Sequence, residues 1–200
     1  GWHALHLVGK SAHAGTTPMN LRADPGVAAS RINLKLREMI RSGSYGDMRA
    51  TMGVLTASPG LVNVVPNEVR CTVDLRKPDD EAMRRMENDI AGFSVLIASE
   101  ESVQLNWKRT ARTDCVPFAQ EVRDRIAASM RSRARTFREL VSGAGHDAQE
   151  MARITRAGMI FVPGEFDGIS HNPRELSTEE QCGHGIDVLL DVAVSFAEEA

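Results

Sequence analysis

Residues 67–76 read NEVRCTVDLR, and apolar and polar side chains alternate along this stretch. Val69, Cys71, Val73 and Leu75 fall on one side of an extended chain, while the residues between them are polar or charged. A period of two is typical of a strand with one buried face and one face in water. The stretch therefore predicts an amphipathic strand whose apolar side is covered by other elements.

The segments around this strand supply the covering helices. Asp24 and Pro25 suit the N-cap and first turn of a helix that extends to about Ser42. Pro78 opens a second helix, whose apolar residues recur every three or four positions: Met83, Met86, Ile90, Phe93 and Ile97. Further strands are expected at residues 2–9, 48–57 and 103–107. The order β-α-β-β-α-β predicts a ferredoxin-like domain over residues 1–110, with both helices on one sheet face.

The second part of the chain, residues 111–200, has the pattern of a parallel α/β sheet. Residues 111–117 are typical of a linker. Helices are expected at 118–133, 146–156 and 178–198, and strands at 137–141 and 158–162. The last helix carries Ile186, Leu189 and Leu190 on one apolar stripe. Because two strands cannot make such a sheet, and the chain starts without Met in what reads as a strand, we expect a segment upstream.

The composition is that of an ordinary globular protein, with 42% hydrophobic and 26% charged residues. No apolar run approaches the roughly 20 residues that a membrane span needs. The net charge of −3 gives no reason to expect nucleic acid or an acidic membrane as a partner. Three cysteines without CxxC spacing argue against a disulfide framework, so a cytoplasmic setting is expected.

Two histidines lie in loops suited to chemistry. His13 is flanked by small residues in GKSAHAGTTPM (9–19), so the backbone there can approach another surface closely. A histidine ring in such a loop can donate a hydrogen bond to an oxyanion. His171 lies in GISHNPRE (168–175), in a long loop after an expected strand, where open α/β sheets place their sites. A structural role stays open for both, and one histidine alone makes no metal site.

Other candidates are weaker from the residues alone. Arg76 ends its strand on the polar side, where a guanidinium can hold a carboxylate through two hydrogen bonds; a solvated strand-end arginine is the alternative. Asn63 precedes the same strand. The glycine-rich turn before His146, Gly143-Ala144-Gly145, either lines a site or simply connects a strand to a helix.

Together, four motifs carry a resemblance. They are Gly9 to Met19, Asn63 to Arg76, SGAGHDA (142–148), and FVP (161–163) followed by GISHNP (168–173). In this order they make the whole chain resemble the C-terminal half of the N-carbamoyl-L-amino-acid hydrolase, allantoate amidohydrolase and β-ureidopropionase family. These dinuclear-metal amidohydrolases are related to aminoacylase and glutamate carboxypeptidase.

The resemblance implies a metal-dependent hydrolase of a carbamoyl or ureido C–N bond. Residues 1–110 would form the lid, or dimerisation, domain, and residues 111–200 the C-terminal part of the metal-binding domain. His13 would stabilise the oxyanion in the partner subunit's site, and His171 would be one ligand of two divalent metals (zinc, manganese, cobalt or nickel). Substrate would be bound by these residues: Asn63, Arg76, Gly143, Ala144 and Gly145. The partners implied are a second copy, through the lid, and a small carbamoyl compound.

The family's other metal ligands and its general base have no counterpart in these 200 residues, so this chain alone is expected to be inactive. Two alternatives remain: a dipeptidase or aminoacylase of the same superfamily, and a non-catalytic dimerisation module.

Overall fold

The computed structural model describes residues 1–198, and the chain divides after Cys115 into two compact units. We call Gly1–Cys115 unit 1 and the part from Val116 onward unit 2. The division lies five residues beyond the boundary of 110 expected from sequence (115 − 110). Each unit is described by itself.

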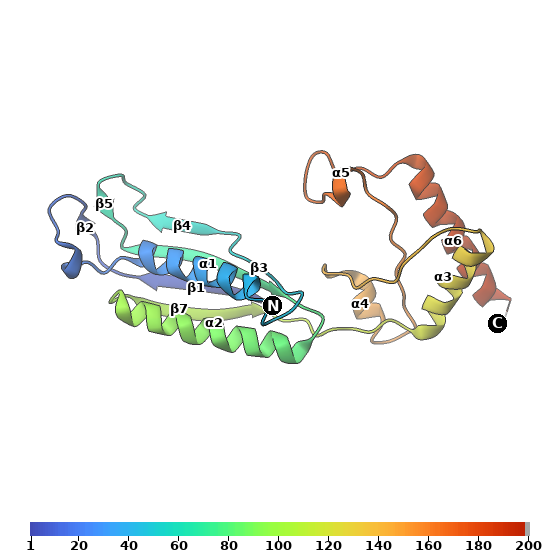
Figure 1. Cartoon of the computed structure of the whole chain (residues 1–200), viewed down its shortest axis with the longest axis horizontal. Coiled ribbons are helices and arrows are strands. Elements are labelled where there is room, and N and C mark those ends of the chain that lie inside the picture. Colours follow the sequence, from blue (N-terminus) through green and yellow to red (C-terminus); the bar gives the residue numbers. More distant parts are fainter. Residues whose placement is uncertain (199–200) are drawn as a thin grey trace. The chain divides into compact units, whose positions relative to one another are not determined.

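Unit 1 is a mixed α/β unit in which two long helices pack on one sheet (Figure 1). Its elements are β1 (Trp2–Val8), β2 (Ala12–His13), the 3-10 turn η1 (Met19–Leu21), α1 (Pro25–Arg41), β3 (Arg49–Thr51), β4 (Leu55–Ser58), β5 (Val64–Val65), β6 (Glu68–Arg76), α2 (Asp80–Glu100) and β7 (Gln104–Ala111). Asp24 caps α1 and Asp79 caps α2, each accepting two backbone N–H groups.

The main sheet has the strand order β3-β6-β1-β7, and β4 also pairs with β6. All of these pairings are antiparallel. The predicted alternation of the opening stretch is confirmed, because Val69, Cys71, Val73 and Leu75 are buried while their neighbours in β6 are not. These four residues form a core with Leu5 and Leu7 of β1 and with the inner faces of α1 and α2. Burial of this apolar surface is the main stabilising contribution to unit 1.

The strand expected at 48–57 is interrupted. β3 pairs Thr51 with Asp74, whereas β4 pairs Leu55 with Cys71, so one extra residue is inserted between the two registers. The side chain of Thr72 fills the gap by accepting a hydrogen bond from the Val54 N–H at 3.1 Å. An inserted residue of this kind is a β-bulge, which bends the edge strand without breaking its attachment to the sheet.

In unit 2, the two strands expected at 137–141 and 158–162 were wrong. Residues 116–198 contain the helices α3 (Gln120–Ser132), α4 (Asp147–Met151), α5 (Glu165–Gly168) and α6 (Glu179–Ala197), and no strand. A strand needs a neighbour to pair its N–H and C=O groups, and this unit offers none. The helix expected at 146–156 is also shorter, since α4 ends at Met151.

The last helix packs on α3 with a different face from its predicted apolar stripe. Val188 and Val192 are buried, whereas Ile186 is 65% exposed and both Leu189 and Leu190 are 59% exposed. Both sides of α6 are apolar, and α3 covers only one of them. The exposed side is the kind of patch that isolated domains seldom show. None of the helices in residues 1–198 is long and apolar enough to cross a membrane.

Candidate functional site

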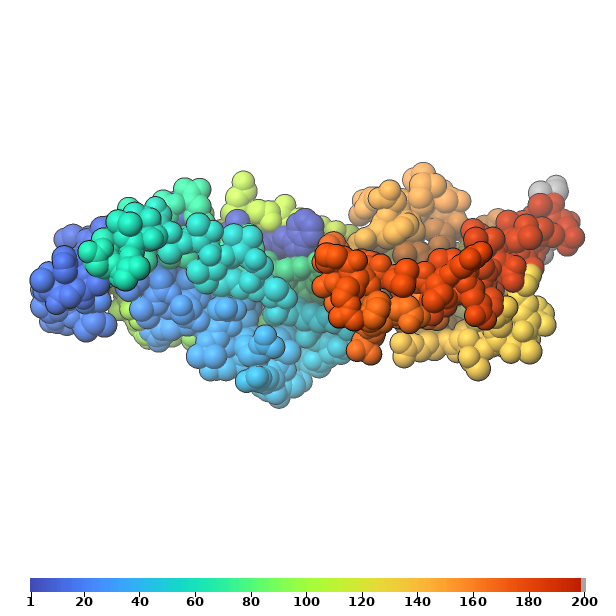
Figure 2. Space-filling view, turned by 90° about the horizontal axis from the view of Figure 1, so that it is seen from above, coloured from blue at the N-terminus to red at the C-terminus, as the bar shows by residue number. Residues whose placement is uncertain are grey.

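The loops that carry His13 and Asn63 lie side by side at one end of unit 1 (Figures 1 and 2). The short strands β2 and β5 pair with each other, which places His13 opposite Val64. Beyond this pair, the Ala14 N–H donates to the Asn63 carbonyl oxygen at 2.9 Å. Two candidates that are 50 positions apart in the sequence (63 − 13) are therefore neighbours in the fold.

The ring of His13 is held in one orientation. Its Nδ1 accepts backbone N–H groups from Gly15 at 3.0 Å and from Thr16 at 3.2 Å. An imidazole nitrogen that accepts carries no hydrogen, so a neutral His13 bears its hydrogen on Nε2. The residue is exposed, so Nε2–H is available as a donor to a molecule outside the loop.

The base of the His13 loop depends on a close backbone contact. The Lys10 N–H donates to the Ala23 carbonyl oxygen at 2.9 Å, which closes the loop directly before α1. Gly9 lies against this closure, where an added Cβ would lie 2.2 Å from the Ala23 oxygen and 2.7 Å from Cδ of Pro25. Only glycine fits this approach without a shift of the backbone.

A second connection inside the loop comes from Arg22, which sequence reasoning did not single out. Its Nη2 donates to the Ala14 oxygen at 2.6 Å and to the Thr17 oxygen at 2.9 Å, and its Nε donates to the same Thr17 oxygen at 3.0 Å. The spacing of Arg22 in the sequence carried no signal for these contacts, because they depend on how residues 14–17 turn.

Arg76 lies at the opposite end of unit 1 from His13. It ends β6, while Asn63 lies before the first residue of β6, Glu68. A strand rises about 3.3 Å per residue, so the eight steps from Glu68 to Arg76 span roughly 26 Å. The Nε and Nη2 of Arg76 donate to Oδ2 of Asp74 at 2.9 and 2.7 Å, and this contact raises the pKa of Arg76. The predicted outward direction of Arg76 is confirmed by its partial exposure.

In unit 2, His171 lies in an exposed turn with a left-handed backbone, φ 56°. The Glu175 carboxylate accepts its N–H at 2.8 Å and the Ser170 hydroxyl at 3.1 Å, so Glu175 braces the backbone of the turn. Within residues 1–198, no three His, Cys, Asp or Glu side chains are placed to hold a metal ion. The residues described here do not form a metal centre by themselves.

The glycine-rich turn of unit 2 leads directly into α4. The Ser142 hydroxyl donates to the Ala144 oxygen at 2.9 Å and accepts the Ala144 N–H at 3.2 Å. His146 is the N-cap of α4, and its Nδ1 accepts the Ala148 N–H at 3.0 Å. Gly143, Ala144 and Gly145 are exposed in this unit, so the turn is accessible to a ligand.

A buried polar network lies among the side chains of unit 1 that face α2. The Trp107 Nε1–H donates to Nδ1 of His3 at 3.0 Å, and Nε2 of His3 lies 3.3 Å from Oε1 of Glu87. Arg112 donates to the other oxygen of Glu87 at 2.7 Å. Since indole only donates, this arrangement requires a neutral His3, and burial lowers the pKa of His3.

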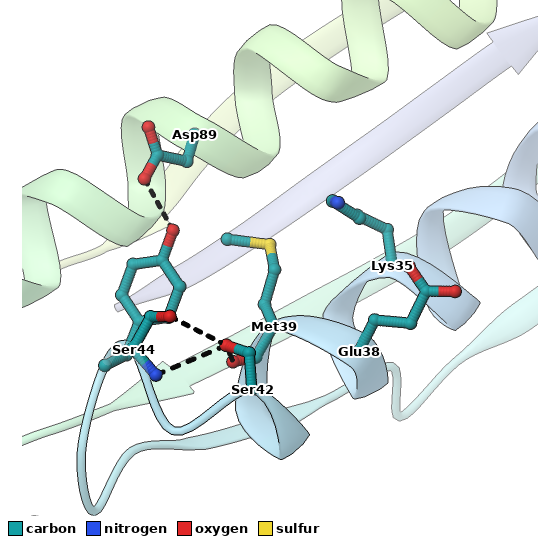
Figure 3. Close-up of a pocket in the computed structure, with 7 residues that line it drawn as sticks. Lys35, Glu38, Met39, Ser42, Ser44 and Asp89 are labelled. Carbon is teal, nitrogen blue, oxygen red and sulfur yellow. Dashed lines mark hydrogen bonds between the residues drawn. The ribbon is translucent and has the colours of Figure 1, made fainter.

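A shallow depression lies between the C-terminal end of α1 and α2 (Figure 3). It is lined by Lys35, Glu38, Met39, Ser42, Ser44, Tyr45 and Asp89. The Tyr45 hydroxyl donates to Asp89 at 2.6 Å, and burial together with this carboxylate raises the pKa of Tyr45 to about 12. The contact fastens the turn after α1 to α2, and none of the predicted site residues borders the depression.

Known proteins that are similar in sequence to this chain include amidohydrolases. The chain is 34% identical to an N-carbamoyl-L-amino acid amidohydrolase of Geobacillus stearothermophilus and 32% identical to an allantoate amidohydrolase of Bacillus subtilis. In both alignments, 98% of this chain covers 47% of the relative. The chain thus spans about half the length of these relatives.

A solved structure that is similar to this chain is also an amidase, and the chain again matches about half of it. A hydantoinase/carbamoylase family amidase from Burkholderia vietnamiensis superposes with a TM-score of 0.91 at 31% identity, over 97% of this chain and 46% of that chain. The sequence model of peptidase family M20/M25/M40 matches residues 7–195, nearly the whole chain. On this match and these identities, the chain belongs to peptidase family M20/M25/M40.

Proposed function

We propose that this chain supplies the lid and the C-terminal segment of a metal-dependent amidohydrolase that cleaves a C–N bond of a carbamoyl or ureido compound. The names of the relatives at 34% and 32% identity support this substrate class. The observation that carries the proposal is the His13 ring, oriented as an Nε2–H donor beside Asn63. By "complete enzyme" we mean this chain together with a segment that matches the rest of those relatives.

In this proposal, unit 1 is a ferredoxin-like lid and unit 2 is the C-terminal part of the metal-binding domain. The strand order β3-β6-β1-β7, with α1 and α2 connecting strands of the same sheet, supports the first assignment. The exposed apolar side of α6 supports the second, because Ile186, Leu189 and Leu190 need a covering layer that unit 2 lacks.

Each candidate side chain has a role that fits its chemistry. The Nε2–H of His13 donates to the oxygen that becomes negative when the carbamoyl carbon is attacked. The Arg76 guanidinium binds the carboxylate of the substrate through two parallel hydrogen bonds. Asn63 donates through its amide, and the Gly143-Ala144-Gly145 turn lines the pocket with backbone groups.

These roles require two copies of the chain. A carbamoyl amino acid is far shorter than the roughly 26 Å that separates the ends of β6. His13 and Asn63 of one copy therefore cannot contact the same small molecule as Arg76 of that copy. A two-fold dimer resolves this, with His13 and Asn63 reaching into the site that holds Arg76 of the other subunit. Exposed apolar side chains in the same loops, Met19, Leu21, Leu61 and Val62, suit a surface that is covered on assembly.

His171 is proposed as one ligand of a two-metal site. A catalytic zinc is held by about three protein ligands, and the described residues supply no such group. The other ligands are assigned to the segment that only the relatives contain. The exposed position of His171, in a turn braced by Glu175, leaves its ring accessible to such a site.

A substrate panel tests the proposed function. The complete enzyme is assayed with N-carbamoyl-L-amino acids, allantoate, N-acetyl-L-amino acids and dipeptides. We expect kcat/KM for a carbamoyl or ureido compound to exceed that for the other classes by about tenfold or more, equivalent to one or two directed hydrogen bonds. Preference for a dipeptide or an N-acyl amino acid favours a dipeptidase or aminoacylase instead. Dimers that hydrolyse none of the compounds favour a non-catalytic dimerisation module.

A further inference from the structure

Arg22 is bonded to the same short segment that carries His13. Its guanidinium donates to the carbonyl oxygens of Ala14 and Thr17, at distances between 2.6 and 3.0 Å. These two residues flank Gly15 and Thr16, whose N–H groups point at Nδ1 of His13. A planar guanidinium bound to two carbonyl groups fixes the path of the backbone between them.

The backbone of Ala14 is held on both sides. Its N–H donates to the Asn63 oxygen at 2.9 Å, and its carbonyl oxygen accepts from Arg22 at 2.6 Å. A further turn contact, from the Thr17 N–H to the His13 oxygen at 3.1 Å, closes the segment. The orientation of the imidazole and its position beside Asn63 therefore depend on the same few hydrogen bonds.

Arg22 is half-buried and is anchored next to α1 by the pairing of its neighbour Ala23 with Lys10. The guanidinium thus connects a fixed point at the base of the loop to the residues that set the His13 ring. An arginine used only for solubility would not direct three donor contacts to two backbone oxygens.

We propose that Arg22 is a positioning residue, which holds residues 14–17 so that His13 keeps Nδ1 as an acceptor and presents Nε2–H. This inference rests on the proposed role of His13 as an oxyanion donor. Arg22 itself touches no substrate in this proposal, and it acts through the Ala14 and Thr17 carbonyl groups.

The direct test is the tautomer of His13 in the 200-residue chain. Long-range ¹H–¹⁵N spectra separate the two neutral tautomers, and His13→Gln assigns the signal. We expect the Nε2–H form in the unaltered chain and a mixture of both forms in Arg22→Met. Exchange of the Gly15 and Thr16 amide hydrogens should accelerate about fivefold or more, as for the loss of an ordinary hydrogen bond. Arg84→Met, at an exposed position of α2, is the matched control and should change neither signal.

Unchanged His13 signals and amide exchange in Arg22→Met overturn the inference. If that variant does not fold, Arg22→Lys decides, because lysine lacks the planar guanidinium and its Nε–H and cannot reproduce the set of three contacts to Ala14 and Thr17. An Arg22→Lys chain with the tautomer and exchange rates of the unaltered chain overturns it equally.

Kinetics in the complete enzyme give an independent readout. Arg22→Met should lower kcat more than it raises KM, and the double variant with His13→Ala should be no slower than His13→Ala alone. Multiplied effects in the double variant contradict a role that acts through His13. The spectra need no substrate, so an inactive complete enzyme with the expected tautomer change refutes the proposed function and not the assignment of Arg22.

Discussion

At the scale of single residues, Gly9 is the position where the His13 loop tolerates a side chain least. An added Cβ meets the Ala23 oxygen at 2.2 Å, and this oxygen belongs to the backbone that closes the loop. We predict that Gly9→Ala lowers the free energy of unfolding of unit 1 by about 1–3 kcal/mol, the usual cost of overpacking. Both tryptophans, Trp2 and Trp107, lie in unit 1, so urea unfolding followed by fluorescence measures this change.

Gly92 provides the matched control for Gly9→Ala. It lies inside α2, and an added Cβ meets nothing within 4 Å. Gly92→Ala should stabilise unit 1 by about 0.5–1 kcal/mol, because alanine restricts the unfolded chain and favours the helix. If the two variants change stability in the same direction, the close approach at Gly9 is not what limits the loop.

Arg76 is the residue whose replacement tests substrate binding. In the complete enzyme, we predict that Arg76→Lys lowers kcat/KM about 30- to 150-fold, mainly through KM. Lysine cannot reproduce a two-point contact with a carboxylate, and the loss corresponds to about 2–3 kcal/mol. Steady-state kinetics with a carboxylate-bearing substrate measure the effect. An unchanged kcat/KM would remove Arg76 from the site, and Arg84→Lys on α2 serves as the control.

At the scale of elements, the sequence predicted unit 1 better than unit 2, for a physical reason. The strands and helices of unit 1 bury their apolar faces against each other, so the alternation in β6 and the spacing in α2 match the burial in the fold. Residues 137–141 and 158–162 have a strand pattern but no strand to pair with, so they stay irregular. The stripe of Ile186 and Leu190 is exposed for the same reason.

The sequence identified the residues of the candidate site but not which of them lie close together in the fold. Motifs identified His13, Asn63 and Arg76, and the parity of β6 predicted that Arg76 points away from the core. No local pattern contained the pairing of β2 with β5 that joins His13 to Asn63, because this contact spans 50 residues. The contacts of Arg22 were missed because they end on backbone oxygens, which every residue has.

The network around His3 predicts how the stability of unit 1 depends on pH. Burial lowers the pKa of His3 in the folded chain, whereas the unfolded value is about 6.5. Below about pH 6.5 the unfolded state therefore binds more protons, and the free energy of unfolding should fall as the pH is lowered from there towards the folded pKa. Urea unfolding at several pH values between 7.5 and 5 measures this dependence.

The contribution of His3 is isolated by comparing two histidines of β1. His3→Gln removes the titrating group and should flatten the pH dependence between 6.5 and 5. His6 is on the opposite face of the same strand and lies 3.3 Å from the Glu68 carboxylate, so His6→Gln measures the contribution of a histidine outside the buried network. Equal slopes for His3→Gln and the unaltered chain would assign the pH dependence to other groups.

At the scale of the whole molecule, the metal site is proposed to be divided between this chain and the rest of the complete enzyme. We predict that the 200-residue chain binds zinc or manganese weakly, since the described residues offer no cluster of three ligands. Titration calorimetry measures the affinity. Tight binding of one ion per chain that His171→Ala abolishes would mean that this chain forms the metal site without the segment found only in the relatives.

The assembly of two copies gives the sharpest prediction, because it separates action in the neighbouring site from action in the same subunit. In the complete enzyme, His13→Ala removes an oxyanion donor and should lower kcat about 10²–10³-fold. His171→Ala should inactivate the subunit that carries it. If His13 serves the partner's site, a mixed dimer of the two variants has one site with both defects and one site with neither.

Subunit exchange between the two inactive variants should therefore restore activity. With equal amounts and random pairing, half of the dimers are mixed and one site in each works, so about a quarter of the original activity should return. Two differently tagged variants show by affinity capture that mixed dimers have formed. If His13 served its own subunit, each site of a mixed dimer would carry one defect, and the mixture would stay as inactive as its parents. The roughly 26 Å between the two ends of β6 prevents one small substrate from contacting His13 and Arg76 of the same chain, so the first outcome assigns His13 to the partner's site and the second assigns Arg76 to it.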